Sequence, residues 1–306
     1  MDHATSTPAT PLAVSIVPPA APQRARRRIV PYILIAPGAI WMILFLLMPI
    51  LMMVYVSFWT QTTFAIKPIL TTQSWVNFFS SSTYIASLWT TLRIWLIVLA
   101  ATLVVGYPTA LFVGLFVRNK TLSTVLLVLC VIPFWTSFLI RVLAWRPMLG
   151  EQGAINIILR ALHLIDHPIS ALLYTELSVI IGMTQIYCVF MVGPIAFMLG
   201  RIDPNIIEAA RDLGAGFWRI FLRIILPLSM PGVVVGAIFV SVMVLGEFAT
   251  SAALSGRKVN MLGNIIITQV GSLKWAFAAV VGVVLTIVMG MVVSLFLRIV
   301  DLRREL

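Results

Sequence analysis

Charged residues are scarce in this sequence. Only 10% of the 306 residues are Asp, Glu, Lys or Arg, and 61% are hydrophobic. An average soluble domain has roughly a quarter of its residues charged. The composition therefore excludes an ordinary soluble domain and predicts a protein that crosses a membrane several times.

Cysteine and histidine are scarcer still. Cys130 and Cys188 lie in apolar runs without a CxxC pair, so we interpret them as small packing residues. His3 lies near the N-terminus, and His163 and His167 lie between apolar runs, so no histidine site can form inside the bilayer. These absences argue against a membrane-embedded enzyme. The chain also lacks a GxxxxGK[ST] phosphate loop, so we expect it to hydrolyse no ATP itself.

Six uncharged apolar runs approach or exceed the roughly 20 helical residues that cross a hydrocarbon core of about 30 Å. Each run is continuously apolar instead of alternating, which favours helices over barrel strands. We therefore predict an all-α membrane protein with six transmembrane helices. The predicted spans are residues 32–58, 94–117, 121–140, 177–200, 224–246 and 275–297. Prolines interrupt most of them, and each can kink its helix.

The distribution of Lys and Arg predicts the orientation, because cytoplasmic loops hold the excess. Four flanks together hold 13 of the 21 Lys and Arg residues, although they are much shorter than the remaining connections. These Lys- and Arg-rich flanks are Arg24–Pro31, Arg118–Lys120, Arg201–Arg223 and Arg298–Leu306. Both termini and the segment 201–227 are therefore predicted to face the cytoplasm. The basic residues flank spans and form no continuous face, so topology explains the net charge of +11 better than nucleic-acid binding does.

Two segments outside the spans carry local signals. Residues 1–31 combine a Pro-, Ala- and Thr-rich stretch with a basic run, which predicts a disordered cytoplasmic tail before a membrane domain over residues 32–306. Gly153–Ile165 has apolar residues at helical spacing. It is either a helix on the outer membrane surface or one packed on the bundle.

The last connection between cytoplasmic ends of spans predicts two short helices joined by a tight turn. The Asp203 side chain can cap the free amides at the start of the first helix. Pro204 suits the first position of that helix, where its missing amide costs no hydrogen bond. Gly214 suits the left-handed residue that ends such a helix, and a second helix begins at Phe217. Ile206, Ala209, Ala210 and Leu213 share a face, with Glu208, Arg211 and Asp212 as a polar rim. This pattern favours a docking surface, and an interfacial connector lying on lipid is the alternative.

The spacing of this loop resembles a known family motif. Glu208-Ala209-Ala210, three residues, Gly214, nine residues, Ile224, one residue and Leu226-Pro227 resemble the EAA loop of permease subunits of bacterial ABC importers. The resemblance implies the type I importer permease fold. It also implies that Glu208, Ala209, Ala210, Asp212, Gly214, Leu226 and Pro227 couple the permease to a separate ATPase.

The same resemblance implies the partners and the location. The expected partners are a second, different permease, two copies of an ABC ATPase that uses ATP and Mg²⁺, and an extracytoplasmic solute-binding protein. The chain itself is expected to bind no cofactor and no metal, and to lie in the bacterial inner membrane.

A finer resemblance concerns the solute. Ile132–Arg141, the EAARDLGA segment, Leu245–Phe248 and Met261–Asn264 are similar to the spermidine/putrescine permeases, in particular to the first of the two permeases of that system. This implies polyamine import. Permeases for opine-like solutes, aminoethylphosphonate and ferric iron share much of this sequence and remain alternatives.

Few residues are suited to contact a polycation in the membrane, which requires carboxylates or aromatic faces. Glu247, at the Gly246 break, is a better candidate than Glu176, although a salt bridge from Glu247 to Arg141 or Arg93 is an equal alternative. Trp135 and Phe134 follow Pro133 and are candidates for an aromatic wall or gate, with Tyr187 and Trp95 as partners; ordinary packing is the alternative. An ion-coupled secondary transporter is less favoured, because the middles of all six runs carry no charge.

Overall fold

A computed structural model describes residues 30–61, 66–117 and 119–301. The chain divides into two units, residues 1–51 and 52–306. Of the predicted tail over residues 1–31, only the last two residues fall in the described part.

The first unit contains one apolar helical stretch. It begins with α1 (Val30–Met42), passes through the π-helical turn η2 (Ile43–Leu47) and enters α2 (Met48–Val56). Leu34–Val56 is long and apolar enough to cross a membrane. Most side chains from Leu34 to Leu51 are exposed, as expected for a helix that faces lipid.

After the end of α2, the second unit contains a small hairpin. Strands β1 (Trp59–Gln61) and β2 (Ile66–Leu70) pair antiparallel, with Trp59 opposite Leu70 and Gln61 opposite Ile66. Helix α3 (Gln73–Ser80) follows, and Phe78 on it is fully buried. The hairpin contacts the long C-terminal helix α14 (Trp275–Asp301).

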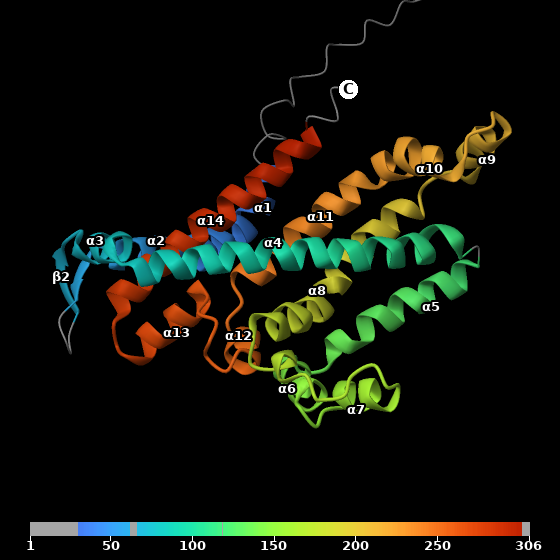
Figure 1. Cartoon of the computed structure of the whole chain (residues 1–306). Coiled ribbons are helices and arrows are strands. Elements are labelled where there is room, and N and C mark those ends of the chain that lie inside the picture. Colours follow the sequence, from blue (N-terminus) through green and yellow to red (C-terminus); the bar gives the residue numbers. More distant parts are fainter. Residues whose placement is uncertain (1–29, 62–65, 118, 302–306) are drawn as a thin grey trace, which may run out of the picture. The chain divides into compact units, whose positions relative to one another are not determined.

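The core of the second unit is formed by long helices, as the apolar runs predict. Helix α8 (Glu176–Leu199) packs along α4 (Ser82–Leu111) and α11 (Leu226–Leu245), and α11 also packs against α14 (Figure 1). Helix α4 continues into the π-helical turn η3 (Phe112–Phe116). It starts at Ser82, well before the predicted residue 94, so Arg93 lies on the helix, where its side chain pairs with Glu176.

A glycine allows α8 and α11 to approach closely. A Cβ at Gly232 on α11 would lie only 2.6 Å from the carbonyl oxygen of Pro194 on α8. Non-bonded carbon and oxygen atoms do not come this close, so only glycine fits there without a shift of one helix. Small residues bring helices together in this way inside membranes, where burial in hydrocarbon does not drive packing.

The predicted span 121–140 is wrong as a single continuous helix. Helix α5 (Lys120–Val131) ends in the 3₁₀ turn η4 (Ile132–Trp135), and α6 (Phe138–Leu149) and α7 (Ala154–Ala161) follow in a new direction. The two halves are bent by 92°. Pro133 removes one helical hydrogen bond, and Thr136 and Ser137 then adopt extended backbone angles, which turns the chain.

Shorter helices complete the fold. They are α9 (Pro204–Asp212), α10 (Phe217–Ile220), the π-helical turn η6 (Phe221–Ile225), α12 (Ala249–Leu254), α13 (Leu262–Gly271) and the 3₁₀ turn η5 (Ser170–Leu172). Within the described residues, five helices are long and apolar enough to span a membrane, or six if the bent pair is one span. The chain is therefore a mostly helical, multi-pass membrane protein.

Of the amphipathic segment predicted over Gly153–Ile165, the part Ala154–Ala161 forms the helix α7. Asn156 is fully buried, donates to the carbonyl oxygens of Gly150 and Ile169, and accepts from the amide of Ile169. Ile158 and Leu162, which belong to the predicted apolar stripe, remain more than half exposed. The segment is thus tied to its own loop by Asn156, while part of its apolar face stays uncovered.

Candidate functional site

Glu247 lies just after α11 and is almost fully buried, at 7% exposure. Helix α11 ends at Leu245, and the chain turns through Gly246 before α12 begins. One carboxylate oxygen of Glu247 accepts the amide hydrogen of Thr250, at 2.8 Å, which satisfies a free amide in the first turn of α12. The other oxygen accepts from the hydroxyl of Tyr187 on α8. The carboxylate is therefore held by two separate elements.

Glu247 lines an open cavity of about 450 Å³ between α8, α11 and the break after α5. The cavity wall includes aromatic, apolar and polar side chains: Phe134, Thr136, Phe138, Arg141, Ile186, Tyr187, Phe190, Val242, Met243, Gly246 and Glu247. Of the predicted residues, the structure thus brings together Glu247, Phe134 and Tyr187. A carboxylate beside aromatic faces is a suitable site for an ammonium group.

Phe190 connects the aromatic residues of the cavity and was not predicted from the sequence. Its ring lies edge-on to Phe134, with centroids 5.4 Å apart, and 6.5 Å from the ring of Tyr187. On the other side it stacks with Phe239 at 6.2 Å. Phe190 follows Tyr187 by three residues and so shares its helix face, a spacing that would have identified it.

Two predicted aromatic residues lie elsewhere. Trp135 is 85% exposed and does not line the cavity, although it directly follows Phe134. Trp95 is half-buried and donates from its indole Nε1 to the hydroxyl of Ser241, at 2.8 Å, which joins α4 to α11. The structure places Trp95 in helix packing and Trp135 on the surface.

The predicted alternative of a salt bridge at Glu247 is not found among the described residues. Arg93 pairs instead with Glu176, the first residue of α8. Arg141 lines the cavity with Glu247, but no ion pair within 4.0 Å joins the two side chains in the described part of the chain. Its guanidinium carbon instead lies 5.3 Å from the centroid of the Phe134 ring.

The loop between α8 and α11 forms the helix pair that the sequence predicts. The Asp203 carboxylate accepts from the amide of Asn205, at 2.9 Å, and caps α9. Gly214 has a positive φ of 78°, and the amide of Ala215 donates to the carbonyl of Ala210. This is the Schellman arrangement, in which a left-handed glycine ends a helix. Helix α10 then begins at Phe217.

The helix pair turns one face to its own chain and leaves the other uncovered. Ile207, which was not among the predicted face residues, is buried and belongs to the main core, with Ala210 and Ala215 packed beside it. Ile206, Ala209 and Leu213 stay exposed, and Leu213 is 88% exposed. The face that carries Ile206, Ala209 and Leu213 is therefore largely uncovered, and Glu208 and Asp212 are exposed beside it.

The helix pair is connected to the bundle by aromatic residues and by the Leu226-Pro227 segment. Phe221 in η6 stacks on Phe217 and meets the ring of Tyr107 edge-on, at 5.7 Å. The hydroxyl of Tyr107 on α4 bonds to that of Ser229, at 2.8 Å, just beyond Pro227. Through these contacts the helix pair touches both α4 and α11.

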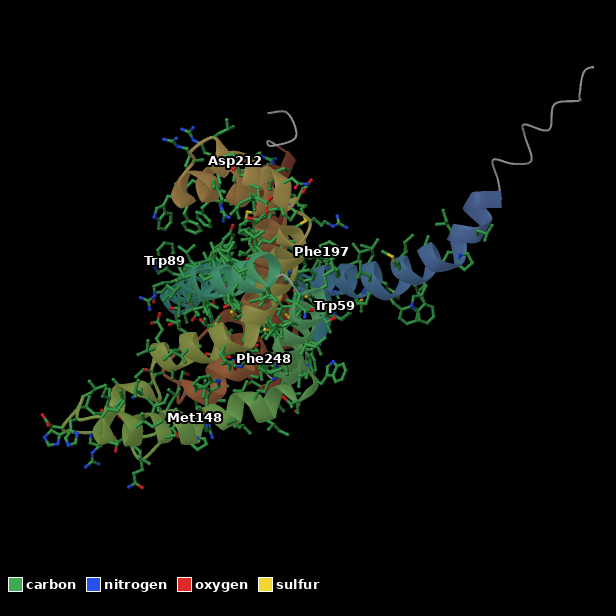
Figure 2. All side chains as sticks on the ribbon, turned by 90° about the vertical axis from the view of Figure 1, so that its right-hand side faces the viewer. Trp59, Trp89, Met148, Phe197, Asp212 and Phe248 are labelled. Atoms are coloured by element: carbon green, nitrogen blue, oxygen red, sulfur yellow. The ribbon has the colours of Figure 1, made fainter. Side chains whose placement is uncertain are left out.

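The cavity and the helix pair lie at separate places in the second unit. Figure 2 shows Asp212, in the helix pair, at the opposite end of this unit from Met148 on α6, with Phe248 between the two levels. One end thus presents an uncovered helix face, and the bundle holds a cavity with one buried carboxylate. Several apolar spans around such a cavity are typical of a multi-pass membrane transport protein.

Comparisons with known proteins identify the family. Residues 106–306 match the family described as "Binding-protein-dependent transport system inner membrane component". The chain is 35% identical over 260 residues to the spermidine/putrescine transport system permease protein PotB of Escherichia coli K12, covering 84% of this chain and 93% of that protein. It is 34% identical to PotB of Haemophilus influenzae, covering 84% and 90%. The chain therefore belongs to this family of inner-membrane transport components.

Solved structures agree with this assignment at the level of the fold. A bacterial alginate ABC transporter in complex with its pentasaccharide-bound periplasmic protein matches with a TM-score of 0.70 and 18% identity, over 89% of this chain and 93% of the matched chain. A second structure of a bacterial alginate importer matches with a TM-score of 0.68 and 19% identity, over 90% and 96%. The matches show the fold of an ABC transporter permease, mostly helical with five or six apolar spans. The hairpin β1–β2 departs from the predicted all-α class, because the short strands after the first span pair with each other.

Proposed function

We propose that this chain is one of two different permease subunits of an ATP-driven importer, and that the solute is a polyamine such as spermidine or putrescine. The observation that carries the proposal is the buried Glu247 carboxylate, facing an aromatic-lined cavity in a chain that is 35% identical to PotB. A polyamine is a flexible chain of ammonium groups. It is therefore complementary to both a carboxylate and aromatic faces.

The orientation follows from the basic residues. We place both termini and the α9–α10 helix pair in the cytoplasm, because these segments are rich in Lys and Arg and cytoplasmic flanks hold the excess of such residues. This requires an even number of crossings, six, with α5 to α7 counted as one broken span. Glu247 and the hairpin β1–β2 then belong to the extracytoplasmic half. The broken span lies beside the cavity, where irregular backbone can face water or protein instead of lipid.

The α9–α10 helix pair is proposed to dock on the ATPase. Its uncovered apolar residues, Ile206 and Leu213, fit an apolar cleft on a partner, and Glu208 and Asp212 form the polar rim of the contact. Closure of two ATPase subunits on ATP would move α10 and, through Phe221 and Tyr107, tilt α4 and α11. ATP and Mg²⁺ are bound and hydrolysed by the ATPase, and this chain transmits the motion.

The transport cycle is proposed to be alternating access. A binding protein delivers the polyamine to the extracytoplasmic face, which the alginate complex with its periplasmic protein supports by analogy. ATP-driven closure opens the cavity outward, and an ammonium group enters between Glu247 and the rings of Phe134 and Tyr187. Hydrolysis then resets the bundle and releases the solute inward.

The direct test is uptake of radiolabelled spermidine by cells whose other polyamine importers are deleted and which carry the complete system containing this chain. Deletion of this chain alone should abolish saturable uptake, and its re-expression should restore it. Uptake that does not depend on this chain would refute polyamine import. Competition by unlabelled aminoethylphosphonate instead of putrescine would assign the importer to another solute class.

A further inference from the structure

Arg141 is a charged residue in the cavity that the proposed function does not use. It lies on α6, after the break, and its guanidinium sits over the ring of Phe134, which lies before the break in η4. The same cavity contains Glu247. A cation therefore already occupies one of the aromatic faces that are suited to the solute.

The contacts of Arg141 are weak for a charged side chain in such a place. Its Nε is buried without a hydrogen-bond partner among the described residues. The ion pair that the described residues do form is Arg93–Glu176, not one between Arg141 and Glu247. A cation–π contact is a weak interaction for a charged group, and one guanidinium donor, the Nε–H, is left without an acceptor. A competing cation can therefore replace Arg141 at the Phe134 ring.

The helix that carries Arg141 is anchored separately from the cavity. One turn further along α6, Trp145 donates to the side-chain oxygen of Gln185, at 3.4 Å, and Arg146 donates to the carbonyl oxygen of Ala253, at 3.0 Å. These bonds hold α6 against α8 and α12. Displacement of Arg141 from the Phe134 ring thus requires a rotamer change and no movement of α6.

The charges lining the cavity cancel. Glu247 contributes one negative charge and Arg141 one positive charge, and the other lining residues are formally neutral at pH 7. With Glu247 alone the cavity would carry a net negative charge and attract any small cation. With Arg141 present, a single positive charge gains little on entry. A chain with several ammonium groups can engage both the carboxylate and the Phe134 ring that Arg141 leaves.

We propose that Arg141 is a resident cation, which occupies the Phe134 face beside Glu247 in the solute-free state and is exchanged for an ammonium group of the solute. This proposal rests on the proposed function, in that the solute is taken to be polycationic. It assigns Arg141 a role in specificity: it disfavours singly charged cations and leaves polyamines able to compete.

The test is equilibrium binding to the assembled importer in lipid nanodiscs without its binding protein, so that the affinity of the binding protein does not mask the permease. Arg141→Gln removes the charge, and we expect spermidine to bind about tenfold more tightly, from the loss of one positive charge within several ångströms. Radiolabelled methylamine, with one charge, should bind measurably to Arg141→Gln but not to the unchanged importer. Arg141→Lys keeps the charge and should behave like the unchanged protein in both assays.

Several outcomes would overturn the proposal. They are unchanged or weaker binding of both amines by Arg141→Gln, or an Arg141→Lys variant that behaves like Arg141→Gln, which would point to a structural role. Should Arg141→Gln fail to assemble, Arg141→Met removes the charge and keeps an unbranched apolar chain for the same test. Failure of the proposed function has a different signature, namely no spermidine uptake by cells with the unchanged importer. The methylamine comparison still decides the role of Arg141 in that case.

Discussion

Tyr187 on α8 donates its hydroxyl to the carboxylate of Glu247, the first side chain beyond the Gly246 turn after α11. The same carboxylate accepts the amide of Thr250 at the start of α12. Glu247 therefore joins three helices and also presents the cavity's negative charge. Its structural and chemical roles can be separated by a substitution that removes only the charge.

The first prediction is that Glu247→Gln abolishes polyamine uptake and leaves assembly intact. The glutamine side-chain oxygen can still accept a hydrogen bond from Thr250 or Tyr187, so the helix junction persists. The matched control is Glu176→Gln, whose partner Arg93 is about half exposed, so that the pair contributes little. Uptake rates in cells and the yield of purified complex measure both effects. Unchanged uptake kinetics in Glu247→Gln would exclude the proposed role.

The second prediction separates two adjacent aromatic residues. Phe134→Ala should weaken spermidine binding severalfold, because it removes a ring from the cavity. Trp135→Ala should leave the solute affinity of the assembled importer unchanged, because Trp135 does not line the cavity. Spermidine binding to nanodisc-embedded importer measures both. A larger loss from Trp135→Ala would place the solute path on the other side of η4.

The third prediction concerns the turn between α9 and α10. Gly214 has φ of 78°, and a Cβ there costs about 1–2 kcal/mol of backbone strain. Gly214→Ala should therefore weaken ATPase association and lower coupled transport, and Gly214→Pro should abolish both. Gly216→Ala is the control, because Gly216 has φ of −70° and nothing within 4 Å of an added Cβ. Co-purification of the ATPase with each variant is the measurement. Equal retention by the Gly214 variants would argue against this turn as the docking element.

The fourth prediction tests the docking face by charge. Glu208 is exposed beside the uncovered residues Ile206 and Leu213, so Glu208→Arg should not destabilise the permease itself. If this face sits in the ATPase cleft, the reversed charge should abolish transport and solute-stimulated ATP hydrolysis. Normal hydrolysis with this variant would contradict docking through α9. The thermal stability of the purified permease serves as the check on folding.

The fifth prediction concerns stability. A Cβ added at Gly232 would lie 2.6 Å from the Pro194 carbonyl oxygen, so Gly232→Ala should push α8 and α11 apart and cost about 1–3 kcal/mol. Gly193→Ala, one residue before Pro194, meets nothing within 4 Å and should be close to neutral. Denaturation of the purified permease in detergent measures the difference. Equal stability of the two variants would mean that the helices do not cross closely at Gly232.

The sequence predicts the long helices well, because continuous apolar runs leave few alternatives in lipid. It misplaces features that depend on tertiary partners. Arg93 lies inside α4 and pairs there with Glu176 from another helix, and a rule that ends spans at charges does not anticipate a charged residue within a helix. The 92° bend after Pro133 has a local cause, but the sequence did not indicate whether the proline would kink the span or break it.

The candidate sites differ in how much of their structure follows from residues close together in the sequence. The cap at Asp203 and the left-handed Gly214 are consequences of short-range chemistry and were predicted. Glu247 was identified because a carboxylate is unusual beside apolar spans. Its hydrogen bond to Tyr187 joins residues 60 positions apart and required the structure. The burial of Ile207 likewise depends on how α9 rests on the bundle.

The most direct test of the account is ATP-dependent transport by the purified, complete importer in proteoliposomes, with ATP supplied on the ATPase side and binding protein on the other. The account predicts that radiolabelled spermidine accumulates only with ATP, is displaced by putrescine and not by aminoethylphosphonate, and fails to accumulate with Glu247→Gln. ATP-dependent accumulation of another solute with no transport of spermidine would contradict it.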